Sequence, residues 1–297
     1  MQPLAAWLVA RPQNAVIALA VTLSLPVLHV FSGIFMVLLV LRQTLRLAVV
    51  EGASAGALLA LVYLLAGIPV MEAVVAVLTT LLPAVLLALA LQSTRSLALT
   101  MQLSALVAAA AVLGFHIAVD DLTAFWQPVM AFMLEWAQTN ALTEQVQMMQ
   151  ANPAIVAHML TIVLVLSSWT MYAVYLFFGY RYAAAEPGKT GPYGRFCDLN
   201  FGRVIALLVA VVASLAFATG MPWLQSLAIV LFTVFWFQGL AVVHWMFVDG
   251  DLPLFVVIMV YVLLPFLHLF LIMALAVVGY TDAWFGYRRR AVASNEE

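Results

Sequence analysis

The sequence predicts an all-α, polytopic helical membrane protein with about eight or nine transmembrane helices. Hydrophobic residues make up 67% of the chain and charged residues only 8%, and the mean hydropathy is +1.14. A soluble domain carries about 25% charged residues because its surface faces water. So few charges cannot cover a water-facing surface of this size, so the lipid bilayer is the expected solvent for most of the chain.

Long intervals without charged residues define the expected spans, because a bilayer crossing needs about 20 mostly apolar residues. The intervals are residues 14–41, 52–71, 73–94, 96–119, 145–180, 204–248 and 252–281. Pro26 and Gly33 are expected to break the first interval, with its second helix ending near Arg46. Gly220-Met221-Pro222 is expected to turn the chain inside 204–248.

The whole chain, 1–297, is expected to form a single integral membrane domain. Its parts are N-terminal helices over 14–118, an extracytoplasmic amphipathic segment over 119–153, and C-terminal helices over 154–290 with a cytoplasmic loop at 181–203. That loop contains the single cysteine, Cys197, so no intramolecular disulfide can form.

Basic residues mark the cytoplasmic side of a membrane protein and therefore indicate its topology. One final helix after Asp251 would place the arginine run at 288–290 outside, against this rule. Either Pro265 breaks the last interval into a hairpin, or an earlier segment is re-entrant; the C-terminus is expected inside. The predicted location is the bacterial inner (cytoplasmic) membrane, and three residues are expected to anchor the chain at lipid head groups: Arg288, Arg289 and Arg290.

The segment 119–153 is amphipathic. Its apolar residues recur at helical spacing: Leu122, Phe125, Trp126, Val129, Phe132, Met133 and Trp136. Asp120, Asp121 and Glu135 lie elsewhere on the helical wheel. This pattern predicts either a helix lying in the membrane interface or a cap over the helix bundle.

Polar and ionisable residues inside a bilayer are costly, so each one is a functional candidate. Gln238 lies deep in an apolar stretch, where it either hydrogen-bonds between helices or contacts a ligand; Gly239 beside it allows close helix approach. His244 and His268 lie in neighbouring predicted helices. They either form a paired or ligand-binding site, or each bonds to a backbone carbonyl or a water molecule.

Two acidic residues have simpler interpretations. Glu51 is interpreted as a helix-end charge that pairs with Arg46 at a cytoplasmic turn. Asp282 is interpreted as a structural residue that pairs with Arg289 or with a basic loop residue.

Motifs of known enzymes are missing from the sequence. It contains no HExxH, no Gly-x-Ser-x-Gly, no Walker A loop and no dinucleotide-binding fingerprint. The chain is therefore expected not to be an enzyme, with no catalytic residue, cofactor, metal site or nucleic-acid partner.

The last third contains Phe237-Gln238-Gly239-Leu240-Ala241-Val242-Val243-His244 and ends in Gly279-x-x-Asp282-x-Trp284-Phe285-x-x-Arg288-Arg289-Arg290. These runs resemble the YybS-like family of bacterial membrane proteins of unknown function. That family is distantly similar to the substrate-binding S-components of energy-coupling-factor (ECF) transporters. The resemblance implies an S-component-like helical bundle with extra C-terminal helices, which binds a small molecule while a separate module hydrolyses ATP.

Two functions follow as hypotheses. The first is a transporter-like protein that binds a small molecule or a lipid within its helices, with four candidate residues: Gln238, His244, His268 and Trp169. The alternative is a non-transporting membrane scaffold or regulator that acts through membrane-protein partners. A transporter should have a concave pocket at mid-bilayer depth that is lined by Gln238 or a histidine, whereas a scaffold should have no such cavity and should pair its polar groups between helices.

Overall fold

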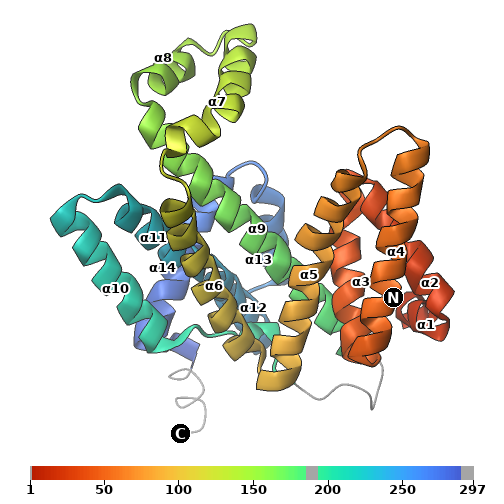
Figure 1. Ribbon diagram of the computed structural model, residues 1–297. Helices are drawn as coiled ribbons and strands as arrows, with labels where there is room; N and C mark the ends of the chain where they lie inside the picture. Colours follow the sequence, from red (N-terminus) through yellow and green to blue (C-terminus); the bar gives the residue numbers. More distant parts are fainter. Residues whose placement is uncertain (1, 185–192, 289–297) are drawn as a thin grey trace, which may run out of the picture. The chain divides into compact units, whose positions relative to one another are not determined.

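The computed structural model describes residues 2–184 and 193–288, and this part of the chain is helical without any strand (Figure 1). In these described ranges, seven helices are long and apolar enough to cross a membrane, or eight if one sharply bent pair counts as a span. The prediction of a polytopic helical membrane protein is therefore confirmed, and the upper count of eight meets the lower end of the expected range.

Proline and glycine set two of the expected breaks. Helix α2, Pro12–Ser24, is followed by a 3-10 turn at Pro26–Leu28 and by α3, His29–Arg42. Helix α10, Gly202–Thr219, ends at Gly220, whose positive φ of 66° suits glycine, and α11, Pro222–Thr233, begins two residues later. The expected break at Gly33 is wrong, because this residue lies inside α3.

The last apolar interval is also broken. Helix α13, Leu254–Leu263, and helix α14, His268–Phe285, flank a break that contains Pro265. At the other end of the chain, α1, Gln2–Ala10, meets α2 at a bend of 116°, as in a broken span or a re-entrant loop. The last interval thus contains a helix break at Pro265, and the first helices contain a sharp bend.

The chain divides into two compact units. Unit 1 consists of residues 1–101 and 170–196 and contains α1–α5 together with the end of α9, Pro153–Ala184. Its central helix is α3, in which every residue from Ser32 to Leu41 is buried. Helices α4, Leu45–Leu65, and α5, Val70–Thr94, pack around α3.

Glycines let other helices of unit 1 approach α3 closely. The Tyr175 ring lies where a side chain at Gly33 would be, and a side chain at Gly179 would collide with Val37. Gly33 is therefore a packing position rather than a helix break, which explains why the chain stays helical there.

Unit 2 consists of residues 102–169 and 197–297. It holds most of α6, Leu97–Ala118, the start of α9, and α10–α14, including α12, Phe235–Asp249. Together α11 and α12 form the most buried of the candidate spans. In their most apolar stretch 78% of the residues are buried, compared with 28–39% in the other spans.

Helices α12 and α14 are in backbone contact. A Cβ atom at Gly239 would collide with the Leu275 carbonyl oxygen, and one at Gly279 would collide with the Phe235 carbonyl oxygen. The expected close approach at Gly239 is confirmed, and it brings the polar residues of the two helices within hydrogen-bonding reach.

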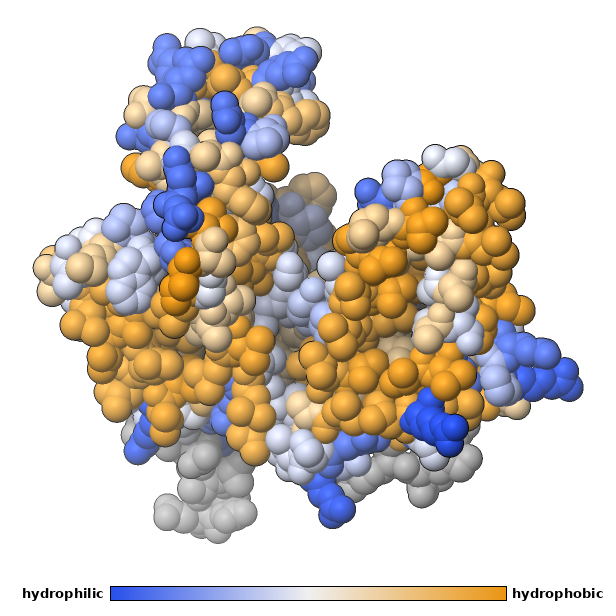
Figure 2. All heavy atoms as spheres, in the orientation of Figure 1, coloured by the Kyte–Doolittle hydropathy of each residue, from blue (hydrophilic) through white to orange (hydrophobic). Residues whose placement is uncertain are grey.

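Large apolar side chains cover the helix flanks of both units (Figure 2). Soluble monomers rarely expose such extended apolar surface, whereas a lipid environment favours it. The multi-pass membrane location follows from this surface and from the apolar spans.

The amphipathic segment forms a hairpin of α7, Leu122–Thr139, and α8, Thr143–Ala151, which extends beyond the ends of α6 and α9 (Figure 1). The Asp121 carboxylate caps α7 by accepting hydrogen bonds from two backbone N–H groups. Trp126 is buried and donates a hydrogen bond to Thr161, but Phe132 is 69% exposed and Trp136 is also exposed. Most of the apolar stripe is therefore open to its surroundings.

Candidate functional site

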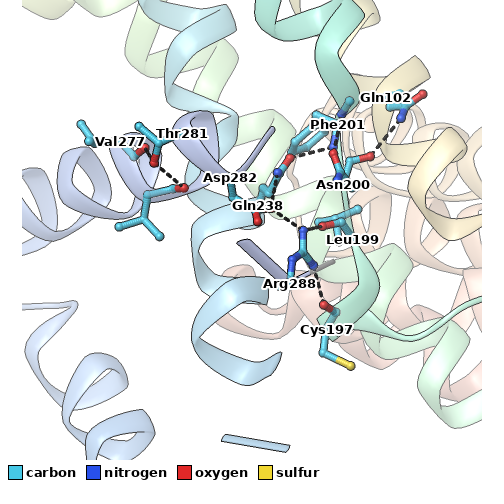
Figure 3. Close-up of polar contacts among 12 residues, drawn as sticks. Gln102, Cys197, Leu199, Asn200, Phe201, Gln238, Val277, Thr281, Asp282 and Arg288 are labelled. Carbon is cyan, nitrogen blue, oxygen red and sulfur yellow. Dashed lines mark hydrogen bonds and ion pairs between the residues drawn. The ribbon is translucent and has the colours of Figure 1, made fainter. Parts of the chain in front are cut away.

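A buried polar cluster joins three separate segments of unit 2. Its side chains are Gln238 on α12, Asp282 on α14 and Arg288 just after α14, and its backbone groups come from residues 197–201 (Figure 3). We call these residues the C-terminal polar cluster.

Gln238 lies at the centre of this cluster and is 0% exposed. Its Oε1 atom accepts a hydrogen bond of 2.7 Å from the Phe201 N–H group, and its Nε2 atom donates one of 2.8 Å to the Asp282 carboxylate. Both ends of the amide are thus engaged within the protein. Of the two roles expected for Gln238, this geometry supports hydrogen bonding between segments.

Asp282 and Arg288 form a buried ion pair at 2.6 Å, with exposed fractions of 1% and 8%. The same guanidinium donates to the carbonyl oxygens of Cys197 at 2.6 Å and Leu199 at 2.8 Å. One Asp282 oxygen, Oδ1, has no hydrogen-bond partner among the described residues. The charges nevertheless compensate each other, because carboxylate and guanidinium are in direct contact.

This placement differs from the expected anchor. Arg288 does not extend to the surface but fastens the segment before α10 to the end of α14. It also pairs with Asp282, a role that was expected of Arg289 or of a basic loop residue. Arg289 and Arg290 lie outside the described residues, as does Lys189 in the 181–203 loop.

The segment that Arg288 holds is fixed from a second side. Gln102 on α6 donates a hydrogen bond of 2.9 Å to the Asn200 carbonyl oxygen, and the Asn200 side chain accepts one of 2.7 Å from the Gly202 N–H group (Figure 3). The cluster therefore joins α6, α12 and α14 to the start of α10.

Trp169, another of the four expected ligand residues, is also buried in unit 2. Its indole N–H donates to the Ser104 hydroxyl at 3.0 Å, and its ring lies edge-on to Phe237 with centroids 5.2 Å apart. Its polar atom is thus used within unit 2, in the way buried tryptophans usually are.

The two expected histidines lie in different surroundings. The His244 Nδ1 atom is 2.8 Å from the Leu240 carbonyl oxygen, so it carries the proton and donates. Nε2 then accepts from the Tyr261 hydroxyl at 3.2 Å. His268 is exposed at the first residue of α14.

A histidine pair was missed in the sequence. His116 on α6 and His158 on α9 stack with centroids 5.2 Å apart, and Nε2 of His116 lies 3.2 Å from Nδ1 of His158. The Val112 carbonyl oxygen, 2.9 Å from Nδ1 of His116, fixes the orientation of the first ring. The two residues are 42 positions apart, so no local spacing indicates their contact.

Glu51, in unit 1, has a different environment from every residue above. It is 1% exposed and lies on the buried face of α4 with Ala48, Gly52 and Ala55. Neither carboxylate oxygen has a hydrogen-bond partner among the described residues. The side-chain amide of Gln43 lies close to Glu51, and its own buried Oε1 atom also has no hydrogen-bond partner in the part of the chain that the structure describes.

The expected ion pair between Arg46 and Glu51 is therefore wrong. Arg46 is exposed on the other side of α4, whereas Glu51 points into unit 1. A signal was present in the sequence: Glu51 shares one helical face with the small residues Ala48 and Ala55, which is typical of a helix packed against its neighbours.

A comparison with protein-family models identifies the family. The model described as "Predicted membrane protein (DUF2232)" matches residues 14–283, most of the chain. The chain belongs to this family. The matched part of the DUF2232 chain contains Glu51, Gln238 and Asp282 and ends shortly before Arg288. Searches of curated proteins and of solved structures found no match.

Proposed function

We propose that this protein is a transporter-like membrane protein of the bacterial cytoplasmic membrane that binds a small molecule or a lipid within unit 1, next to Glu51. The observation that carries the proposal is the buried Glu51 carboxylate inside an apolar span, whose two oxygens have no hydrogen-bond partner within residues 2–184 and 193–288. An uncompensated ionisable group in a membrane helix is costly and usually marks a substrate or ion pathway.

The proposal places the site away from the residues expected from the sequence. Gln238 and Trp169 use their polar atoms within unit 2, so their contacts account for them without a ligand. The resemblance to S-components of energy-coupling-factor transporters supports a ligand-binding bundle. We further propose that the chain is not an enzyme and that a partner or an ion gradient supplies the energy.

The test is whether a molecule copurifies with the protein through Glu51. The full chain would be purified in lipid nanodiscs as wild type, Glu51→Gln and Glu72→Gln, and bound molecules would be quantified by native mass spectrometry. Glu72 is the matched control, since it is an exposed glutamate at the start of α5 in the same unit.

We expect the wild type and Glu72→Gln to retain one molecule in near-stoichiometric amount and Glu51→Gln to lose it. Equal retention by all three proteins, or no molecule on the wild type, contradicts the proposal. Glutamine has nearly the same size as glutamate, so Glu51→Gln preserves packing. Loss of binding by a folded variant therefore results from loss of the carboxylate.

The alternative, a scaffold or regulator with membrane-protein partners, rests on a different observation. The exposed apolar stripe of α7, including Phe132 and Trp136, is available to a partner or to the lipid interface. Under this alternative, replacing Phe132 and Trp136 with serine abolishes binding of the membrane-protein partner, whereas Glu51→Gln leaves that binding intact. The transporter proposal predicts the reverse order of effects.

A further inference from the structure

Building on the proposed function, we infer that Glu51 binds a small monovalent cation, either a proton or an alkali-metal ion, and exchanges it during transport. The inference names the class of ligand that the Glu51 carboxylate itself takes. It rests on the chemistry of the unpartnered atoms, on the size of the space around them and on the charges of the neighbouring helices.

The unpartnered atoms of Glu51 and its nearest polar neighbour are hydrogen-bond acceptors. They are the two carboxylate oxygens of Glu51 and the Oε1 atom of Gln43. An ionised carboxylate has only acceptor oxygens, so a positive charge or a proton donor satisfies it and an anion does not. The Gln43 amide also carries N–H donors but no charge, so the negative charge of the Glu51 carboxylate remains to be balanced and favours a cation.

The space around the carboxylate is small. Ala48 and Ala55, one turn to either side on the same face of α4, are 0% exposed. A Cβ atom at the adjacent Gly52 would lie 3.4 Å from both Leu81 on α5 and Met36 on α3, which is already van der Waals contact. This close packing favours a proton or a small ion directly at the carboxylate over an organic cation, and the proposed small molecule or lipid would lie beside this packed face.

One carboxylate balances one positive charge, which favours a monovalent ion over a divalent one. Divalent cations usually take six or more oxygen ligands, often with several carboxylates. Among the described residues, no group of three His, Cys, Asp or Glu side chains is placed to hold a metal ion. The Glu51 position does not offer the ligand set that a divalent ion needs.

Other charged or titratable groups on α4 and on the helices packed against it lie near helix ends: Arg11 before α2, His29 and Arg42 at the two ends of α3, Arg46 and Tyr63 near the two ends of α4, and Glu72 and Arg95 at the two ends of α5. Arg42 adjoins Gln43 and is the residue best placed to compete with a cation. An ion pair between Arg42 and Glu51 is thus the opposing explanation that the experiment must separate.

Cation exchange would couple the site to conformation. With the cation bound, the carboxylate is neutralised and is buried at lower cost; without it, the charge favours a conformation that admits water. A ligand that binds only one of these conformations would then be coupled to the cation.

The experiment measures the thermal unfolding midpoint of the full chain in detergent micelles, using wild type, Glu51→Gln, Glu72→Gln and Arg42→Gln. One series varies pH from 5 to 8 without alkali ions. A second holds pH 8 and compares sodium, potassium and lithium chloride with N-methylglucamine chloride at equal ionic strength.

We expect low pH, or one alkali ion, to raise the wild-type midpoint by several degrees, with Glu72→Gln following the wild type and Glu51→Gln showing no response. A response to pH alone identifies the proton, and a saturable response to one salt identifies the ion. The same response in wild type and Glu51→Gln overturns the inference.

The Arg42 variant tests the opposing explanation. If Arg42 and Glu51 form an ion pair, Arg42→Gln lowers the midpoint and the double variant with Glu51→Gln restores it; that result also overturns the inference. If Glu51 binds a cation, Arg42→Gln keeps the cation response.

The two proposals fail separately. A cation response that depends on Glu51, without a copurified molecule, supports the cation site and contradicts the proposed binding of a small molecule or a lipid. A copurified molecule that depends on Glu51 without any cation response does the opposite.

Discussion

Asp282 in unit 2 and Glu51 in unit 1 are both acidic, both 1% exposed and both on helices able to span a membrane. Asp282 contacts the Arg288 guanidinium at 2.6 Å and the Gln238 amide at 2.8 Å. Neither oxygen of Glu51 has a hydrogen-bond partner among the described residues. Two carboxylates with equal burial therefore have opposite electrostatic surroundings.

The difference separates a structural role from a functional one. A buried charge that is paired and hydrogen-bonded holds segments together, and removing its partner is strongly destabilising. A buried charge without a partner weakens the fold, so its presence points to a ligand or an ion that occupies the site for part of the time. Variants that remove one charge or one contact at a time test this contrast.

The largest effect is expected for Arg288→Met. It leaves Asp282 charged and uncompensated, so the free energy of unfolding should fall by about 3–5 kcal/mol. A denaturant titration in mixed micelles, followed by tryptophan fluorescence, measures this. Arg203→Met, at an exposed site on α10 in the same unit, should change it by less than about 0.5 kcal/mol.

The double variant Arg288→Met with Asp282→Asn should recover most of the loss, because it removes the orphaned charge as well. If the double variant is as unstable as the single one, the ion pair is not what stabilises the cluster. Asp282 and Glu51 would then not differ in the way described.

The next effect is expected for Gly239→Val. Its side chain would collide with the Leu275 backbone and push α12 from α14, at a cost of about 2–3 kcal/mol. Gly114→Val on α6 is the control, since no atom lies within 4 Å of the added Cβ there. Equal losses in the same titration would show that helix propensity, rather than the crossing of α12 and α14, determines the result.

A smaller loss is expected for Gln238→Leu. It leaves the buried Phe201 N–H group without an acceptor and removes one donor from Asp282, which should cost about 1–3 kcal/mol. Gln225→Leu, at an exposed site on α11, should be nearly neutral. If the Gln238→Leu protein is fully stable but no longer retains a bound molecule, the ligand site is at Gln238 in unit 2 and not at Glu51.

Composition and breaker residues were sufficient for much of the fold. Charge-free stretches located most spans, and the breaks at Pro26, Gly220 and Pro265 follow from residues that interrupt helices. Gly33 misled because glycine also permits close packing, and only the position of Tyr175 distinguishes the two uses. Local sequence does not determine that choice; a helix more than 130 residues away in the chain does.

The site was less accessible to sequence reasoning. Gln238 was identified as a polar residue in an apolar stretch and Asp282 as half of an ion pair, but the two partners of Gln238 lie 37 and 44 residues away in the chain. For Glu51, proximity to Arg46 in the sequence suggested a pair, whereas helical geometry turns the two side chains to different faces of α4. Weighing the small residues on the Glu51 face would have corrected this.

The smallest effect, and one of opposite sign, is expected for Glu51→Gln. Gln keeps the size of the side chain and removes an uncompensated charge, so the free energy of unfolding at neutral pH should stay equal or rise by about 1 kcal/mol. The matched comparison is Asp282→Asn, which neutralises an equally buried acid but strands Arg288 and should be destabilising by several kcal/mol. Both variants are measured by the same titration at low salt. If Glu51→Gln is also strongly destabilising, the Glu51 carboxylate has a protein partner in the folded state, and the two acids belong to the same structural class.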